Sequence, residues 1–196
     1  MAGRGFDLIG VDSSMDMLQI ARERGSEKAD SCLYLLQDMR EFELYGTVRS
    51  VISVCDSINY VTEEEDLLHV FSLVNNYLDP GGIFLFDFNT EHKYRDVVGE
   101  SVIAEDRDDV SFIWYNEYDE EEHLNYIDLS VFVQEKDDLF RKFQEQHVQK
   151  GYTLERICQL LKGAGLLFLK AYDGYTMEPA REDSERIVVA AREQGK

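Results

Sequence analysis

A short apolar run that ends in a carboxylate constrains this chain more than any other feature, because it lies within the first twelve residues. Residues 6–11 suit a buried strand, Asp12 closes the run, and residues 13–25 follow with the apolar spacing of a helix. Ser13 and Asp16 fit an acidic variant of the capping box at the start of that helix. A buried strand that leads directly into an amphipathic helix is the repeating unit of an α/β sheet.

The same alternation continues along the chain. Apolar runs at 33–36, 48–54 and 83–88 predict three more buried strands. Residues 62–78 predict an amphipathic helix that begins with a capping box, with Thr62 as its N-cap. Buried strands that alternate with helices predict an α/β fold with a Rossmann-like, doubly wound, mostly parallel sheet.

The pattern changes after residue 100. Three stretches alternate apolar and polar residues and predict an antiparallel meander with one wet face: 110–118, 124–133 and 140–148. Thr153 then caps a predicted helix, and two further apolar runs near the C-terminus predict an antiparallel hairpin, at 166–172 and 186–191. We therefore expect one α/β domain formed by residues 1–100 and 151–196, with an antiparallel β subdomain inserted at 101–150.

Charge and composition limit the partners of the chain. The sequence has 40 acidic and 20 basic residues, a net charge of −20, so its average field repels nucleic acid and anionic membranes. No apolar run is long enough for a membrane span and no signal segment is evident, which predicts a cytoplasmic protein. The three cysteines and four histidines have no disulfide or metal-ligand spacing, so no metal is expected. A neutral or cationic small molecule is the expected substrate.

Four segments, in this order and spacing, resemble the class I S-adenosylmethionine-dependent methyltransferases, in their small-molecule branch. Residues 10–18 are similar to the second-strand motif of that family, and residues 37–40 to the end of its third strand. Residues 78–82 resemble the turn before its fifth strand, and residues 145–153 resemble the segment between an antiparallel insert and the last helix. The resemblance implies S-adenosylmethionine as cofactor, a cofactor-binding α/β domain, and an insert on the substrate side.

The resemblance also implies roles for individual residues. Asp12 would accept hydrogen bonds from the ribose hydroxyls, and Asp38 from the adenine amino group. The other implied cofactor contacts are Ser13, Met17, Met39, Cys55 and Asp56. The implied substrate contacts are Ser57, Asn59, Tyr94 and Tyr152, and the candidate catalytic bases are His147 and Tyr60. We expect methyl transfer to a small-molecule acceptor, with an amine favoured because an acidic protein tolerates a cation in its cleft.

The sequence departs from the family pattern at its start. The first strand and the Gly-x-Gly-x-Gly turn that approaches the amino-acid tail of the cofactor do not occur in the 196 residues. We therefore expect the chain to begin after that strand. In the family the missing strand lies between the second and fourth strands, so two strand edges would be left unpaired. This raises a second interpretation, a non-catalytic domain that acts as a binding or homodimerisation module.

A third interpretation is an NAD-dependent oxidoreductase, which would likewise use an acid after its second strand. Several of the residues named above also fit a purely structural role. The role of Asp12 could be limited to capping the helix that follows it, and the role of Asp38 to forming a turn. His147 could be a structural histidine. Cys55 and the tyrosines could serve packing, since a small thiol and amphipathic rings suit the edge of a core.

Overall fold

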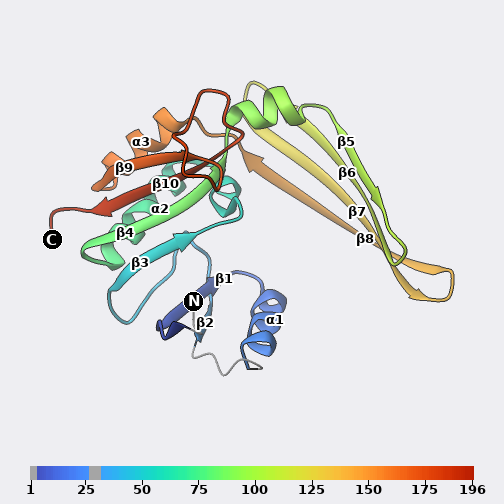
Figure 1. The fold of residues 1–196 in the computed structure, drawn as a ribbon, viewed down its shortest axis with the longest axis horizontal. Coiled ribbons are helices and arrows are strands. Elements are labelled where there is room, and N and C mark those ends of the chain that lie inside the picture. The colour runs from blue at the N-terminus through green and yellow to red at the C-terminus, as the bar shows by residue number, and fades with distance from the viewer. Residues whose placement is uncertain (1–3, 27–31) are drawn as a thin grey trace. The chain divides into compact units, whose positions relative to one another are not determined.

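The computed structural model describes residues 4–26 and 32–196 (Figure 1). The chain divides into two compact units, Met1–Thr47 and Val48–Lys196, which are described separately. No helix among the described residues is long and apolar enough to cross a membrane.

The first unit is a strand–helix–strand segment. Its elements are β1 (Leu8–Asp12), α1 (Met15–Ser26) and β2 (Cys32–Leu36), and the two strands pair in parallel. The two strands expected here are thus confirmed, with bounds shifted by one or two residues. The predicted cap of α1 is wrong by one residue, because β1 extends through Asp12 and the chain needs Ser13 to leave the strand. The Ser14 hydroxyl, not that of Ser13, accepts from the Met17 amide at 3.3 Å.

The second unit is built on a four-stranded sheet with the order β3-β4-β10-β9. Only β3 and β4 pair in parallel; β10 is antiparallel to both of its neighbours, which confirms the predicted C-terminal hairpin. Three phenylalanines of β4 form the centre of the core, and Phe71 of α2 lies 5.8 Å from the Phe84 ring and 5.3 Å from the Phe86 ring. The elements of this layer are β3 (Val48–Ser53), α2 (Glu64–Tyr77), β4 (Leu78–Asn89), α3 (Leu154–Gly163), β9 (Leu166–Asp173) and β10 (Arg186–Glu193).

One of the two predicted helix caps in this layer is correct. Thr153 caps α3, since its side chain accepts from the Arg156 amide at 3.2 Å. The predicted Thr62 cap is wrong: α2 begins at Glu64, its N-cap is Glu63, and that side chain makes no capping bond. The chain is still extended at Glu63, so the helix begins too late for a Thr62 cap. The acidic residues in the first turn of α2 stabilise the start of the helix instead, because they interact with the positive end of the helix dipole.

A second sheet of four antiparallel strands follows, in the order β5-β6-β7-β8 (Figure 1). The three predicted strands are present, and an unpredicted strand, β5, precedes them. The prediction of one wet and one packed face is wrong for the outer part of this sheet, because apolar side chains are exposed on both faces. The strands are β5 (Val102–Asp106), β6 (Val110–Asp119), β7 (Leu124–Lys136) and β8 (Leu139–Lys150).

Two short helical segments were not predicted. A 3-10 helix, η2 (Ser57–Tyr60), follows β3, and a π-helical segment, η3 (Lys93–Val98), follows β4. Both begin just beyond the carboxyl end of one of the two parallel strands. They therefore place polar side chains where α/β proteins bind their ligands.

Candidate functional site

In the first unit, Asp12 and Asp38 leave the same edge of the parallel strand pair. Asp12 ends β1 and is paired in register with Leu36, which ends β2. The Gln37 amide donates to the Asp12 carbonyl at 3.1 Å, so the chain is still held to β1 just before Asp38. The sequence predicted that the two carboxylates lie at the ends of adjacent parallel strands, and the structure has this arrangement.

Both carboxylates also make local contacts. Asp12 accepts from the Ser14 amide at 2.8 Å, which forms a turn before the helix, and the cap of α1 is Ser14 rather than Asp12. Asp38 is held by Arg40, whose Nε and Nη2 atoms lie 3.0 Å and 2.6 Å from its two oxygens. This two-pronged hydrogen bond, with a further bond from the Arg40 amide, keeps the pKa of Asp38 below its usual value. Asp38 is therefore ionised at neutral pH and only accepts hydrogen bonds.

The other cofactor candidates of this unit surround the two acids. Ser13 is the exposed residue between β1 and the cap of α1, and Met17 lies exposed in the first turn of α1. Met39 is half-buried in the turn that follows Asp38. All three lie within five residues of Asp12 or Asp38 in sequence, and they stay predicted cofactor contacts.

In the second unit, Cys55 and Asp56 form an unusual turn after β3. Both have left-handed backbone conformations, with φ of 62° and 52°. Residues other than glycine rarely adopt this conformation, and it is concentrated at functional sites, where the surrounding structure must hold it in place. Ser57 supports the turn by donating to the Val54 carbonyl at 2.9 Å. Cys55 itself is exposed.

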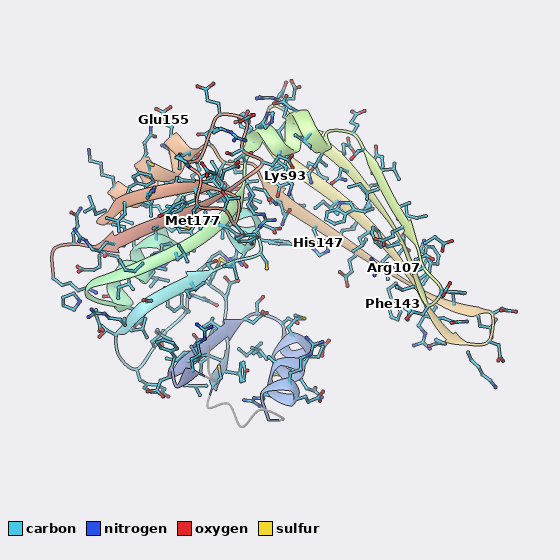
Figure 2. All side chains as sticks on the ribbon, viewed as in Figure 1. Lys93, Arg107, Phe143, His147, Glu155 and Met177 are labelled. Atoms are coloured by element: carbon cyan, nitrogen blue, oxygen red, sulfur yellow. The ribbon has the colours of Figure 1, made fainter. Side chains whose placement is uncertain are left out.

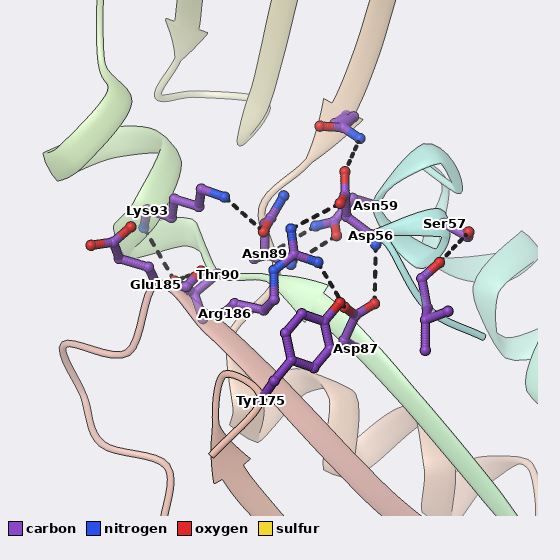
Figure 3. Close-up of polar contacts among 12 residues, drawn as sticks. Asp56, Ser57, Asn59, Asp87, Asn89, Thr90, Lys93, Tyr175, Glu185 and Arg186 are labelled. Atoms are coloured by element: carbon purple, nitrogen blue, oxygen red, sulfur yellow. Dashed lines mark hydrogen bonds and ion pairs between the residues drawn. The ribbon is translucent and has the colours of Figure 1, made fainter. Parts of the chain in front are cut away.

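Arg186, at the start of β10, joins this turn to the main sheet (Figure 3). Its guanidinium lies 2.9 Å from an Asp56 oxygen and 2.7 Å from an Asp87 oxygen. The Asp87 side chain is fully buried, and its other oxygen accepts from the Asp56 amide at 3.0 Å. Tyr175 donates to Asp87 through its hydroxyl and places its ring 5.7 Å from the guanidinium carbon. Burial lowers the pKa of Arg186, but its hydrogen bonds to the two aspartates outweigh burial and raise it.

A chain of amide and hydroxyl groups continues from Asp56 into the antiparallel sheet. Gln149 of β8 donates to Asp56 at 2.9 Å and accepts from the Tyr94 hydroxyl at 2.7 Å. Asn89 donates to the same hydroxyl at 2.9 Å. Asn59 links both sheets, because its amide donates to the carbonyls of Asn89 and Lys150 at 2.8 Å and 2.7 Å. The strained turn is thus braced by side chains from several elements.

Three of the four predicted substrate contacts are buried in or near this network. Asn59, Tyr94 and Tyr152 are at most 3 % exposed. The Tyr152 hydroxyl donates to the Val61 carbonyl, and burial raises the pKa of Tyr94 and of Tyr152. These side chains therefore have the packing role that the sequence left open for the tyrosines. Ser57, which is only half-buried, is the more accessible of the four.

The structure brings the two predicted catalytic residues together. The Tyr60 hydroxyl lies 3.3 Å from His147 Nδ1, and the two rings meet edge to face. His147 Nε2 lies 3.3 Å from a Glu145 oxygen. Burial raises the pKa of Tyr60, and the negative charges of Asp56 and Glu145 raise it further, so this phenol keeps its proton at neutral pH. Of the pair, His147 is the group that can accept a proton.

Comparisons with known proteins agree with these observations. The family described as "Methyltransferase domain" matches residues 1–82. The chain is 31% identical over 193 residues to YqeM of Bacillus subtilis, named as a methyltransferase, with 98% of this chain and 77% of that protein covered. A crystal structure of an S-adenosylmethionine-dependent methyltransferase from Clostridium acetobutylicum matches with a TM-score of 0.93 and 27% identity, over 99% of this chain and 78% of that chain. The chain belongs to the class I S-adenosylmethionine-dependent methyltransferases.

A third match shows the fold alone. The structure of CalS10, an amino pentose methyltransferase from Micromonospora echinaspora, has a TM-score of 0.73 at 16% identity and covers 95% of this chain and 73% of that chain. The predicted α/β, Rossmann-like class is confirmed by these neighbours. Membership of this methyltransferase class also sets aside the oxidoreductase interpretation.

For this methyltransferase, sequence reasoning missed Asp87, Arg186 and Tyr175. One signal was present: Asp87 interrupts the apolar run at 83–88, and a charge in a buried strand needs a partner. Its partner Arg186 could not be identified in this way, because 99 residues separate the two in the chain. Among the described residues, no group of three or more histidine, cysteine or acidic side chains could hold a metal ion.

Proposed function

We propose that this methyltransferase acts on the amine of a small molecule. The observation that carries the proposal is the Tyr60–His147 pair, in which a histidine that can accept a proton lies beside the Glu145 carboxylate. A carboxylate next to the base favours a cationic ammonium group and disfavours an anionic acceptor. The net charge of −20 acts in the same direction. CalS10, whose fold matches, is named as an amino pentose methyltransferase.

The acids of the first unit suit the adenosine part of S-adenosylmethionine. A ribose diol and an adenine amino group are hydrogen-bond donors, and Asp12 and Asp38 are acceptors at the ends of adjacent parallel strands. We assign Ser13, Met17 and Met39 to the same part of the cofactor, and Cys55 and Asp56 of the second unit to its reactive end. When bound, the cofactor supplies an electrophilic methyl group on a sulfonium.

The residues of the chain then have to prepare and orient the acceptor. An ammonium group has no lone pair, so it must lose a proton before it can react, and His147 is placed to take that proton. Tyr60 orients the His147 ring through Nδ1. The nucleophile has to come within about 3–3.5 Å of the methyl carbon and in line with its bond. Ser57 is the proposed direct contact to the acceptor. Asn59 and Tyr152 hold the surrounding backbone, and Tyr94 holds the side chains of Asn89 and Gln149.

Methylation of a panel of amines, carboxylates and phenols, with isotope-labelled S-adenosylmethionine, tests the proposal. We expect amines to be methylated and His147→Gln to lower kcat/KM by about 10²–10⁴, the range of general base catalysis. The loss in His147→Gln should shrink at high pH, where the amine is already neutral. Methylation of carboxylates or phenols alone would rule out the amine assignment. Light scattering on the same samples tests whether the chain forms a homodimer.

A further inference from the structure

One face of the antiparallel sheet carries a continuous set of apolar side chains, here called the apolar face. Strand register aligns them in two neighbouring rows. One row pairs Phe112 with Val131 and Val131 with Phe143, and the next pairs Ile103 with Trp114 and Trp114 with Leu129. Phe143 and Ile103, at the ends of these rows, are 47% and 45% exposed, and Trp114, the single tryptophan of the sequence, is 36% exposed. The apolar face consists of Ile103, Phe112, Trp114, Leu129, Val131 and Phe143.

The apolar face leads directly to the candidate base. On β8, Phe143, Glu145 and His147 alternate with residues of the other face, so all three lie on the same side of the sheet. Phe143 and His147 are labelled in Figure 2. Glu145 completes the row of Trp114 and Leu129, and His147 belongs to the next row, where it meets Tyr60. From Phe143 to His147 the strand rises about 13 Å at ~3.3 Å per residue. Apolar surface, carboxylate and base therefore follow one another along a single line.

We propose that this face selects a cationic amphiphile as acceptor: an amine carried on an extended apolar body. The ammonium group lies by Glu145 and His147, and the body lies along Trp114, Leu129 and Phe143. This inference rests on the amine proposed above and narrows it to a substrate class. The carboxylate within the apolar surface selects the occupant, because an ammonium group neutralises it, whereas a fatty acid or an anionic lipid would be repelled. A contiguous exposed apolar surface is typical of a binding site.

Binding of decyltrimethylammonium, followed by Trp114 fluorescence, tests the inference without any chemistry. This probe is cationic and apolar but has no lone pair, so it cannot be methylated. We expect affinity to rise by about two- to fourfold for each methylene in a homologous series, the upper value being full burial of each group. Decanoate, of similar length but opposite charge, should bind at least tenfold more weakly. Equal binding of both probes, or no dependence on chain length, would overturn the inference.

The strand supplies a matched control on its other face. Phe140 lies on β8, is 45% exposed, and pairs in register with Gln134 on the opposite face of the sheet. We expect Phe143→Ser to weaken decyltrimethylammonium at least fivefold and Phe140→Ser to leave it unchanged. Equal losses in both variants would indicate nonspecific adsorption, and no loss in either would exclude this face; both results overturn the inference.

The same series separates this inference from the proposed function. If the cationic probe binds with the expected chain-length dependence but no amine is methylated, the amine assignment fails and the binding face stands. If short polar amines are methylated as well as long ones, with equal kcat/KM, the assignment stands and the amphiphile is excluded. Circular dichroism of both serine variants verifies that the sheet is folded.

Discussion

Replacing Arg186 with glutamine tests the buried ion pair of the second unit. The Arg186 guanidinium bridges Asp56 and the fully buried Asp87 at 2.9 Å and 2.7 Å. Removal of one partner from such a pair leaves an uncompensated buried charge, which costs about 3–5 kcal/mol. Since 1 kcal/mol shifts Tm by about 2–4 °C for a chain of this size, we expect Arg186→Gln to lower Tm by about 10 °C.

The control is Arg181, which lies in the loop between β9 and β10. Arg181 pairs with Asp173 at 3.1 Å and Asp183 at 3.0 Å, but its side chain is 61% exposed, so Arg181→Gln should cost less than about 1 kcal/mol. Trp114 belongs to the same unit as the buried ion pair, so urea unfolding followed by its fluorescence measures the free energy of unfolding of both variants. Adding Asp87→Asn to Arg186→Gln should recover part of the loss, because the orphaned charge is removed. Equal costs for the two glutamine variants, or additive losses in the double variant, would refute the reasoning.

Two further predictions concern other parts of the chain. Arg40→Gln should raise the pKa of Asp38 toward its usual value, because the hydrogen bonds from Arg40 that lower this pKa are lost. In the wild type, any function of the ionised Asp38 should persist until the pH falls below about 4. NMR titration of the Asp38 carboxyl carbon in both proteins measures the difference in pKa. Phe71→Ala should cost about 3–5 kcal/mol in urea unfolding, because Phe71 is fully buried against Phe84 and Phe86, whereas the exposed Phe140→Ala should cost far less.

The sequence by itself determined the local elements and one edge of the site. Apolar periodicity specified the buried strands and the helices, and Thr153 specified the start of α3, because these signals act over a few residues. The placement of Asp12 and Asp38 also followed from sequence, since adjacent parallel strands end at the same edge of a sheet. The sequence assigned Tyr60 and His147 to the site, but it did not predict that their side chains contact each other.

Tertiary structure alone decided the ion-pair network and the apolar face. The bonds from Arg186 to Asp87 and Asp56 cross 99 and 130 residues of chain, and they depend on the register that sets Arg186 opposite Asn89. The alignment of Phe143 and His147 of β8 with Trp114 of β6 likewise depends on strand register, since a slip of one residue would move the side chains of a strand to the other face. Register is fixed by packing and hydrogen bonding between distant strands, which the local sequence pattern does not contain.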